Sequence, residues 1–387
     1  MKILHIISGI EKDLGGPVFA LKNIIALEKE MGFESEILTC GYSDTVDLRD
    51  FKAKVHIYNR TFPKRFSQSK GAKNWLKQNY NSFDLFIIHG IWAGILLESA
   101  LFLKAQNKKY IIRPAGSLDP FDVRKKYYLK LLLGNMLVKK IFNSSVGLFC
   151  TSDVEAERII TYGANVKKYI LPLPHKNSIQ GNRGNNFRKK YNLKEEDFVF
   201  LFLSRIDYKK GLPLLLKALK NAVNIFPNIK LIIAGSGKKS YENKIKGIID
   251  ILDLRNEVIW TGFLSGEDKA NCFNSSNCFI LPSMNENFGN SIIEALFHGV
   301  PVVISENVYI WRNIIEKNAG WVCKYEIDSI YNVIKEVISN KYDYRVKQKN
   351  TLLAIEQFSY QSVLPVYKQF YSTILTNLKR EHLEKYH

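Results

Sequence analysis

The feature that most constrains the fold is an alternation of short apolar runs with longer amphipathic segments, which occurs twice along the chain. In the first half, the apolar runs cover residues 2–8, 35–41, 84–90, 109–116, 146–152 and 167–174. In the second half, they cover residues 198–205, 229–237, 257–262 and 278–283. Strands that alternate with helices predict parallel, doubly wound sheets. We therefore expect two α/β domains in tandem.

A polar segment at residues 176–192 separates the two series of runs. It is rich in Asn and Gly and carries no apolar period, which is typical of a connection between domains. The chain length of 387 residues also exceeds what one hydrophobic core usually holds. We predict an N-terminal domain at 1–175, the connection at 176–192, a C-terminal domain at 193–358 and a long final helix at 359–387.

The charge balance of the chain favours an anionic partner, because the formal net charge is +19 at pH 7. Residues 51–80 hold eight Lys or Arg and no acid, and residues 123–142 alternate basic and apolar positions at helical spacing. Each stretch predicts either a solvated face over a core or a membrane-surface patch. The cations form no recognisable nucleic-acid motif, so we expect no nucleic-acid partner. The candidate membrane-facing residues are Lys64, Arg65, Lys125 and Lys126.

The sequence does not indicate a membrane-spanning protein, a secreted protein, or a protein held together by zinc or disulfides. No apolar run approaches the roughly 18 to 20 residues of a membrane span. The N-terminus is typical of a first strand rather than of a signal peptide. The five cysteines are scattered and form no Cys-x-x-Cys pair, so we expect neither a zinc site nor a disulfide framework. We interpret most of them as buried thiols in a reducing compartment.

Two motifs of the second half carry groups that suit a phosphorylated ligand. In SRIDYKKGL, Arg205 and Lys210 follow the end of an apolar run. Ligands of open α/β sheets bind outside the carboxyl ends of the strands, and two fixed cations there suit a diphosphate. In AGSG, Gly235 brings the backbone close to either a ligand or a neighbouring strand. Taken singly, each motif is also common on ordinary surface loops.

A third motif, PSMNENFGNSIIEALFHGVPVV, places two carboxylates around the start of a short helix. Glu286 lies in the loop and Glu294 in the helix, with Asn290 as the expected N-cap and Gly299 as the expected C-terminal stop. The free N–H groups at such a helix start attract an anion. A helix-dipole role would explain Glu294, and an exposed loop acid would explain Glu286, but neither explains the pair.

In the first half, glycines and a histidine follow predicted strands. Gly15 and Gly16 come after the first apolar run, where glycines let backbone amides approach a phosphate or a sugar. His89 ends the run at 84–90 and is expected to point toward the same side as the glycines. The alternative for His89 is a purely structural role.

Together these motifs resemble those of the retaining glycosyltransferases of family 4. The similarity rests on Glu286-x7-Glu294 with NFGNSIIEAL and GVPVV, and on SRIDYKKGL, AGSG, TGF and GGP, and it is strongest in residues 199–305. This family has the GT-B fold. The resemblance therefore implies two tandem Rossmann-like, doubly wound domains facing a cleft, with the C-terminal helix crossing back to the N-terminal domain. HGIW and RPAGSLDPF further resemble a branch that acts in capsule, O-antigen or exopolysaccharide assembly, often on lipid-linked acceptors.

The resemblance also implies a role for each motif. Arg205 and Lys210 would hold the diphosphate of a nucleotide-sugar donor, and Glu294 would bind the ribose. The implied catalytic residues are Glu286, Arg205, Lys210 and His89, with Glu286 against the donor sugar. The implied donor-binding residues are Gly15, Gly16, Gly235, Phe288, Gly289, Asn290 and Glu294, of which Phe288 to Asn290 would act through backbone amides.

The same resemblance assigns the acceptor to the domain at 1–175 and the nucleotide sugar to the domain at 193–358. The GT-B fold needs no divalent metal, and the sequence has no Asp-x-Asp motif to hold one. The expected co-substrate is a UDP- or GDP-sugar, with no other cofactor. Ala115 departs from the His or Arg usual in this branch, and LPLPHK replaces the usual Pro-Asn-Gly. His89 or Arg113 could substitute there, and we count Arg113 among the acceptor-side residues.

We therefore expect a retaining transferase that moves a hexose-type sugar to a lipid-linked or oligosaccharide acceptor in surface polysaccharide biosynthesis. The basic N-terminal half places it at an anionic membrane surface, as a peripheral protein on the inner face of the cytoplasmic membrane. The expected oligomeric state is a monomer or a weak dimer. Two alternatives stay open: a nucleotide-sugar epimerase on the same fold, and a non-catalytic protein that binds anionic surfaces.

Overall fold

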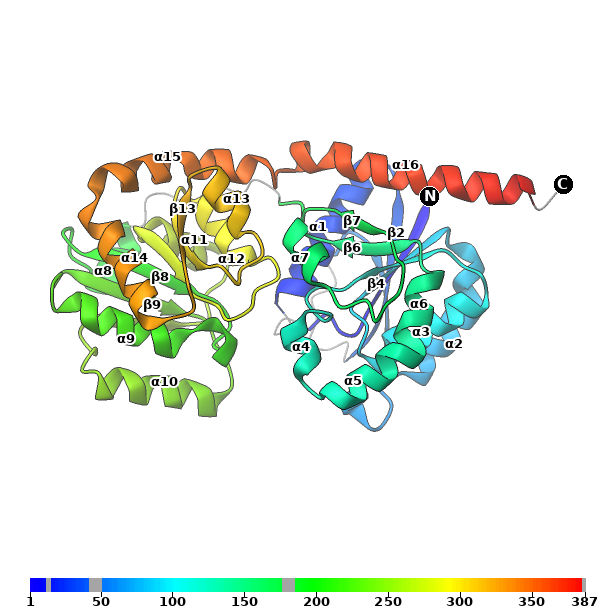
Figure 1. Ribbon diagram of the computed structural model, residues 1–387, viewed down its shortest axis with the longest axis horizontal. Helices are drawn as coiled ribbons and strands as arrows, with labels where there is room; N and C mark the ends of the chain where they lie inside the picture. Colours follow the sequence, from blue (N-terminus) through cyan, green and yellow to red (C-terminus); the bar gives the residue numbers. More distant parts are fainter. Residues whose placement is uncertain (12–14, 42–50, 176–184, 385–387) are drawn as a thin grey trace. The chain divides into compact units, whose positions relative to one another are not determined.

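The computed structural model describes residues 1–11, 15–41, 51–175 and 185–384, without the side chains of Arg65, Asn185 and 377–384. The chain divides into two compact units. Unit 1 consists of Met1–Lys176 and Phe358–His387, and unit 2 of Asn177–Gln357. Each unit is built around one parallel sheet with helices packed against it (Figure 1). The predicted pair of doubly wound α/β domains is confirmed.

Unit 1 contains a seven-stranded sheet in the order β3-β2-β1-β4-β5-β6-β7, and every pairing is parallel. The side chains of β4, β5 and β6 are buried throughout, because helices cover both faces of such a sheet. The neighbouring positions of β1 and β4 make their boundary the switch point of this sheet. The strands are β1 (Lys2–Ile7), β2 (Glu34–Cys40), β3 (Lys54–Tyr58), β4 (Leu85–His89), β5 (Tyr110–Arg113), β6 (Gly147–Cys150) and β7 (Lys168–Ile170).

Strand β3 does not coincide with any predicted apolar run. It lies at the edge of the sheet, next to β2, and all five of its side chains are exposed or half-buried. An edge strand often carries charged side chains, which leaves its sequence, KVHIY, without a continuous apolar signal. Part of the basic stretch at 51–80 is therefore a sheet edge.

The helices of unit 1 come from both ends of the chain. Those before the connection are α1 (Gly16–Glu30), α2 (Lys70–Asn79), α3 (Gly94–Ala105), α4 (Pro120–Arg124), α5 (Tyr127–Leu133), the π-helix η6 (Gly134–Val138), α6 (Lys139–Ser144) and α7 (Asp153–Arg158), with short 3-10 turns η4 (Lys64–Phe66) and η5 (Tyr80–Ser82).

The last helix, α16 (Tyr360–Glu384), also belongs to unit 1 (Figure 1). The hydroxyl of Tyr367 donates to the carbonyl oxygen of Pro172 over 3.2 Å. The hydroxyl of Tyr371 donates to the buried carboxylate of Glu28, which lies in α1. The expectation that the final helix crosses back to the N-terminal domain is confirmed.

Unit 2 contains a six-stranded parallel sheet in the order β10-β9-β8-β11-β12-β13. Its strands are β8 (Phe198–Leu203), β9 (Ile229–Ala234), β10 (Val258–Gly262), β11 (Cys278–Leu281), β12 (Val302–Ser305) and β13 (Gly320–Cys323). Its helices are α8 (Asn185–Lys190), the 3-10 turn η7 (Tyr208–Lys210), α9 (Leu212–Val223), α10 (Lys239–Ile251), α11 (Gly266–Asn274), α12 (Asn290–Phe297), α13 (Trp311–Glu316), α14 (Ile327–Ser339) and α15 (Lys341–Glu356). Of the predicted connection, 176–184 lies outside the described residues, and α8 begins directly after it.

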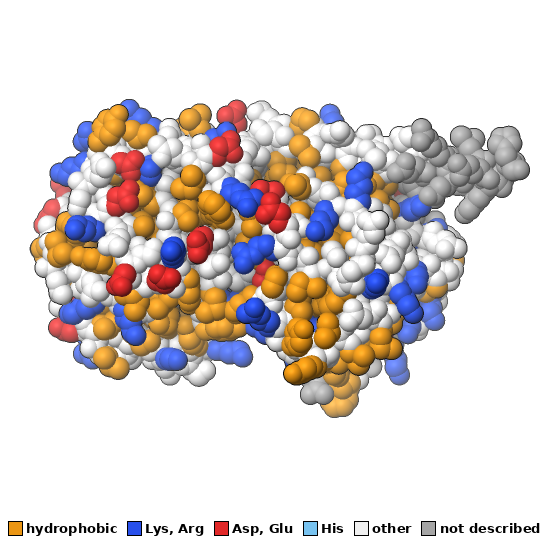
Figure 2. Space-filling view, viewed as in Figure 1, with side chains coloured by type: hydrophobic (Ala, Val, Ile, Leu, Met, Phe, Trp, Pro, Cys, Tyr) orange, Lys and Arg blue, Asp and Glu red, His pale blue; other side chains and the backbone are white. Residues whose placement is uncertain are grey.

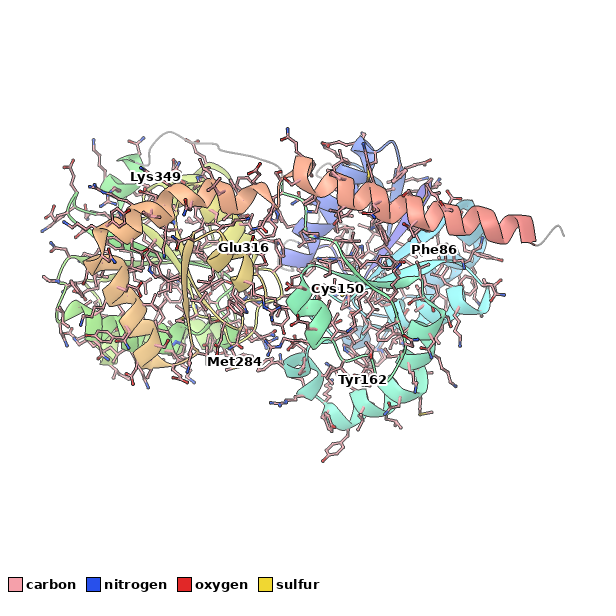
Figure 3. All side chains as sticks on the ribbon, turned by 45° about the horizontal axis from the view of Figure 1, so that its top comes forward. Phe86, Cys150, Tyr162, Met284, Glu316 and Lys349 are labelled. Atoms are coloured by element: carbon pink, nitrogen blue, oxygen red, sulfur yellow. The ribbon has the colours of Figure 1, made fainter. Side chains whose placement is uncertain are left out.

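All five cysteines are free and buried, where the sequence led us to expect most of them to be buried thiols. Cys150, at the end of β6 in unit 1, is labelled in Figure 3. Burial raises the pKa of each thiol for which a shift is resolved, and it raises those of Cys272 and Cys323 to about 12. These thiols therefore stay protonated at neutral pH and are unreactive.

Glu36 of β2 is held between two basic side chains near the edge of the unit 1 sheet. Its carboxylate lies 2.7 Å from Lys2 Nζ and 2.6 Å from His56 Nε2. Burial acts to raise the pKa of Glu36, but hydrogen bonds from Lys2 and then His56 outweigh it, so the pKa is lowered. A carboxylate with a lowered folded-state pKa stabilises the fold above its unfolded pKa, and this stabilisation is lost as the pH falls through the folded value.

We predict that Glu36→Gln lowers the free energy of unfolding by about 1 kcal/mol at pH 7, because the ion pair with Lys2 is lost. The difference from the unchanged chain should shrink as the pH falls from about 4, near the unfolded pKa, through the lower folded-state pKa, below which the carboxyl group is protonated in both states. Urea unfolding at pH 7 and at the acid pH measures this difference in the free energy of unfolding. A gap of equal size at the two pH values would contradict the assignment.

Candidate functional site

The carboxyl ends of β8 and β11 meet at the switch point of unit 2. The two strands are neighbours, and the chain leaves β8 toward β9 but leaves β11 toward β12, in the opposite direction. Loops that diverge in this way form the usual ligand-binding position of an open α/β sheet. The loop after β8 carries Arg205 and Lys210, and the loop after β11 carries Glu286.

Backbone contacts hold these two loops together. The amide of Met284 donates to the carbonyl oxygen of Lys209 over 2.7 Å. Gly211 has a φ of 76°, and a Cβ atom at this position would overlap the carbonyl oxygen of Pro282. Only glycine allows this approach at low cost, and it sets η7 directly against the loop after β11.

Lys210 and Glu286 are brought together by this arrangement, although 76 residues separate them in the sequence. Lys210 Nζ donates to Glu286 Oε2. The two side chains are 12% and 19% exposed, so water screens the pair only in part. Arg205, the other candidate cation, is exposed. An anion that reaches this position would meet one cation already paired and another open to solvent.

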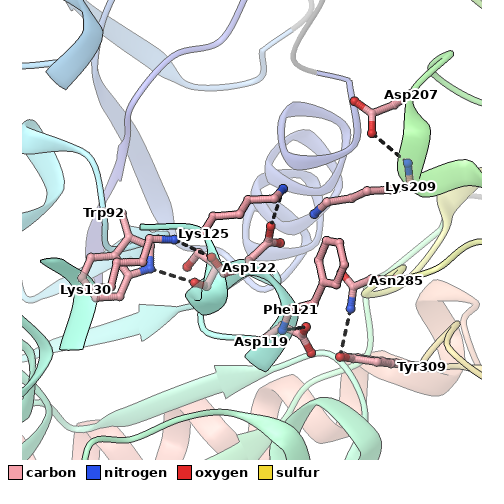
Figure 4. A network of polar contacts seen from close by, with 11 residues as sticks. Trp92, Asp119, Phe121, Asp122, Lys125, Lys130, Asp207, Lys209, Asn285 and Tyr309 are labelled. Atoms are coloured by element: carbon pink, nitrogen blue, oxygen red, sulfur yellow. Dashed lines mark hydrogen bonds and ion pairs between the residues drawn. The ribbon is translucent and has the colours of Figure 1, made fainter. Parts of the chain in front are cut away.

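The backbone of Glu286 is fixed by the loop that follows β12. Its amide donates to the carbonyl oxygen of Asn307 over 3.1 Å, and its carbonyl oxygen accepts from the amide of Tyr309 over 3.0 Å. Asn285 Nδ2 also donates to the hydroxyl of Tyr309 over 3.1 Å (Figure 4). Figure 4 shows a similar local bond in the loop after β8, where Asp207 accepts from the amide of Lys209 over 3.1 Å.

Helix α12 begins one residue earlier than the predicted cap at Asn290 implies. The N-cap is Gly289, with a φ of 78°, and Asn290 is the first helical residue. Glycine takes this left-handed conformation without strain, and a Cβ atom there would fall 2.5 Å from Ile292 Cδ1. At the other end, Gly299 has a φ of 71° and directly follows the C-cap His298, as predicted.

Glu294 has a partner that the sequence did not reveal. Its Oε2 lies 2.6 Å from Nζ of Lys269, on the neighbouring helix α11, with side chains 20% and 29% exposed respectively. Burial lowers the pKa of His298, one turn after Glu294, and the charge of Lys269 lowers it further. Lys269 belongs to no recognisable motif, so only the packing of α11 beside α12 identifies it.

Gly235 makes a close contact with a neighbouring backbone segment, one of the two alternatives the sequence left open. It follows β9 with a φ of 138°, and a Cβ atom there would overlap the carbonyl oxygen of Ser204, which follows β8. Its amide donates to the carbonyl oxygen of Gly262 over 2.7 Å. The backbone after β9 is thus held against the loop that carries Arg205.

In unit 1, the candidate residues lie on both sides of the β1–β4 switch point. Gly15 is the N-cap of α1 with a φ of 59°, and a Cβ atom built on it meets no atom within 4 Å. Gly16 is the first residue of α1. His89 ends β4 and Arg113 ends β5, and their side chains, 5% and 2% exposed, contact each other at 3.2 Å.

The basic candidates of unit 1 lie beside exposed apolar side chains. Lys64 and Lys126 are exposed, Lys125 pairs with Asp122 at 3.1 Å, and the side chain of Arg65 lies outside the described residues. Figure 4 shows the contacts of this region, including Lys125 with Asp122. Arg113 is buried and so does not reach this surface. The exposed apolar side chains of α5 and η6 are Tyr127, Tyr128, Leu129, Leu131, Leu132 and Met136.

Two features are missing from the part of the chain that the structure describes. No group of three or more His, Cys, Asp or Glu side chains is placed as metal ligands would be. No helix in the described part of the chain is long and apolar enough to cross a membrane.

Comparison with protein families and curated proteins gives matches to glycosyltransferases. The family model "Glycosyl transferases group 1" matches residues 184–352. An uncharacterized glycosyltransferase of Methanocaldococcus jannaschii is 28% identical over 204 residues, 52% of this chain and 50% of the relative. The alpha-monoglucosyldiacylglycerol synthase of Streptococcus pneumoniae is 24% identical over 257 residues, 64% of this chain and 57% of the relative. The chain thus spans about half the length of these curated relatives.

Solved structures match the whole chain in fold. Anabaena HepE, solved in complex with UDP and glucose, has a TM-score of 0.79 and 17% sequence identity, over 96% of this chain and 99% of that chain. This likeness identifies the fold of the two sheets and the C-terminal helices as GT-B. The predicted fold class is confirmed.

We predict that Gly235→Ala lowers the free energy of unfolding by more than about 1 kcal/mol, because a Cβ atom would collide with the Ser204 carbonyl oxygen. The matched control is Gly247→Ala in α10, where a Cβ atom meets nothing within 4 Å. It should leave stability unchanged or raise it by up to about 1 kcal/mol. Urea unfolding compares the two, and equal effects would refute the close contact.

Proposed function

We propose that this chain, whose residues 184–352 match the family model of the group 1 glycosyltransferases, moves a hexose-type sugar from a nucleotide-sugar donor to an acceptor with retention of configuration. The observation that carries the proposal is the ion pair of Lys210 with Glu286 at the switch point of unit 2. This pair brings together a cation and a carboxylate from two distant segments. The reaction needs the cation at the diphosphate of the donor and the carboxylate at its sugar.

Lys210 and Arg205 act on the diphosphate. As the bond between the sugar and the phosphate breaks, negative charge grows on the leaving phosphate, and fixed cations stabilise that charge. The first amides of α12, behind Gly289, add partial positive charge at the same side of the sheet. A bound diphosphate competes with Glu286 for Lys210, which releases the Glu286 carboxylate to face the sugar as positive charge forms on it.

Glu294 binds the ribose, and its neighbour Lys269 holds the carboxylate in place until the hydroxyls arrive. The backbone from Phe288 to Asn290 contacts the sugar and phosphate, and Gly235 keeps the backbone after β9 close to the loop that carries Arg205. The donor is a UDP- or GDP-sugar. A thermal-shift screen of UDP-, GDP- and ADP-sugars identifies the base.

We assign the acceptor to unit 1, and we assign Gly15 and Gly16, the N-cap and the first residue of α1, to donor binding through their backbone amides. The acceptor hydroxyl attacks the same face of the sugar that the phosphate leaves, and the phosphate takes its proton. The acceptor is a lipid-linked or oligosaccharide chain of a surface polysaccharide. A lipid acceptor is supported by the Streptococcus pneumoniae relative, whose name includes a diacylglycerol.

We predict that Lys210→Met lowers the rate of sugar transfer at least about 100-fold, because a preplaced cation is lost from the leaving phosphate. Glu286→Gln, which keeps the shape of the side chain, should lower it by a similar factor. The matched control is Lys217→Met, which removes an exposed cation from α9 and should leave transfer unchanged. Transfer is measured with radiolabelled donor, and unfolding curves verify that each variant folds.

Wild-type turnover in both Lys210→Met and Glu286→Gln would refute this site. Release of an epimerised donor in the absence of acceptor would instead establish the epimerase alternative.

We further propose that unit 1 docks on an anionic membrane surface through the α5 face, defined as the exposed apolar residues of α5 and η6 with the lysines beside them. Tyr128 is 85% and Leu132 57% exposed, which is unusual for side chains of this size gathered on one segment. Lys125 and Lys126 precede them directly. Apolar side chains flanked by lysines suit the boundary between lipid headgroups and acyl chains.

Figure 2 shows apolar side chains gathered over the region of α4 and α5, with Lys and Arg side chains around them. Such a surface holds a protein peripherally, and we place it on the inner face of the cytoplasmic membrane, where anionic lipid attracts juxtamembrane cations. Docking there brings the acceptor domain to the lipid-linked acceptor.

We predict that the double variant Tyr128→Ser and Leu132→Ser binds vesicles containing phosphatidylglycerol at least about tenfold more weakly. Each side chain contributes about 1.5 kcal/mol or more when it leaves water, and about 1.4 kcal/mol is a factor of ten. The matched control is Ile251→Ser and Leu353→Ser in unit 2, with exposures of 84% and 54%. Co-sedimentation measures binding. Equal binding by both double variants would refute the α5 face.

A further inference from the structure

A chain of four buried polar side chains runs through unit 1 from β5 across β4 and β1 to helix α1. Arg113 Nη1 lies 3.2 Å from His89 Nδ1, and His89 Nε2 lies 3.0 Å from His5 Nδ1. His5 Nε2 lies 2.8 Å from the carboxylate of Glu28. None of the four is more than 5% exposed. The sequence interpretation included the first two residues but not His5 or Glu28.

Only one arrangement of protons satisfies all three contacts. A guanidinium can only donate, so His89 Nδ1 must accept from Arg113 and carry no proton. The proton of the neutral His89 ring is then on Nε2 and is donated to His5 Nδ1. His5 in turn carries its proton on Nε2 and donates it to Glu28. A second proton on either ring would place two N–H groups against each other.

Glu28, the last of the four side chains, is fixed by two more hydrogen-bond donors. The hydroxyl of Ser35, in β2, donates to Glu28 Oε2 over 2.6 Å, and the hydroxyl of Tyr371, in α16, donates to Glu28 Oε1. The Glu28 carboxylate therefore accepts from three elements of unit 1, namely β1, β2 and α16. The ends of the chain carry opposite charges, which are separated by two neutral rings.

The other groups that face these four side chains do not change the direction in which their hydrogen bonds are donated. Burial lowers the pKa of His89 well below its ordinary value, and the charge of Arg113 adds to that effect. Burial also raises the pKa of Glu155, on α7, and of Tyr367, on α16, both of which interact electrostatically with Arg113. Phe149 covers the guanidinium at 5.8 Å from its ring centre.

We propose that His5, Glu28 and Tyr371 are positioning residues, which hold His89 as a neutral ring with its proton on Nε2 and fix Arg113 at the ends of β4 and β5. Burying ions is costly, and apolar side chains would fill the same space at least as well, so stability alone does not explain the chain. Its outer end borders the switch point of the unit 1 sheet. His89 therefore serves as a fixed, neutral group there, not as a proton carrier.

The first experiment measures the nitrogen chemical shifts of the histidine rings in the full chain labelled with ¹⁵N-histidine. We expect His5 and His89 each to show a protonated Nε2 and an unprotonated Nδ1 at neutral pH, and His89 to keep this form from about pH 5 to about pH 8. Arg113→Met removes the donor that excludes a second proton. In that variant His89 Nδ1 can carry a proton, so its nitrogen signal should move toward the protonated position as the pH is lowered to about 5. His5→Asn and His89→Asn assign the signals.

The second experiment uses Tyr371→Phe, which removes one hydroxyl and keeps the packing of α16. We expect the ring signals of both His5 and His89 to shift, although Tyr371 contacts neither ring. Ser372→Ala, exposed on the same helix, should leave them unchanged. In the transfer assay, which rests on the proposed function, Tyr371→Phe should lower kcat by up to about tenfold with the donor KM unchanged.

A protonated Nδ1 on either ring at neutral pH, titration of His89 in the unchanged protein above about pH 5, or unmoved signals in Tyr371→Phe would each overturn the proposal. A chain that transfers no sugar at all would refute the proposed function, while the nitrogen shifts would still decide the positioning role.

Discussion

The polar loops of unit 2 depend on one steric constraint, the contact of the Gly211 backbone with the Pro282 carbonyl oxygen. Because no side chain separates the two loops, η7 lies directly on the loop after β11, and Lys210 reaches Glu286. The contact of Gly235 with Ser204 repeats this solution one strand further along the sheet. The charged groups are thus positioned by backbone rather than by long side chains, which makes their placement precise.

The two units treat their charges in opposite ways. In unit 2 the carboxylates of Glu286 and Glu294 are each paired with a lysine and remain partly exposed, which the proposed exchange with a charged ligand requires. In unit 1 the charges of Arg113 and Glu28 are buried and separated by two histidines. Exchange suits a co-substrate that must enter and leave in every cycle, and burial suits a group that must keep one orientation.

The sequence predicted the elements whose signal is local. Buried parallel strands appear as continuous apolar runs, so nearly the whole sheet of unit 1 was predicted, but the exposed edge strand β3 was not. The loops with Lys210 and Glu286 were predicted from their motifs, although the bond between them was not. Lys269, His5 and Glu28 were missed, because contacts between distant elements leave no periodicity or motif in the sequence. The predicted N-cap of α12, Asn290, was wrong by one residue, because both Gly and Asn are common at helix starts and the actual cap is Gly289.

Helix α16 gives unit 1 an order of assembly. Glu28 is incorporated near the beginning of synthesis, but Tyr371, one of the hydrogen-bond donors to its carboxylate, is 343 residues further along the chain. A growing chain therefore holds all strands of the first sheet, with one donor to the buried Glu28 carboxylate still missing, while all of unit 2 is made. The first unit to begin folding is the last to be completed, and a chain that stops at the end of unit 2 would lack part of the core of unit 1.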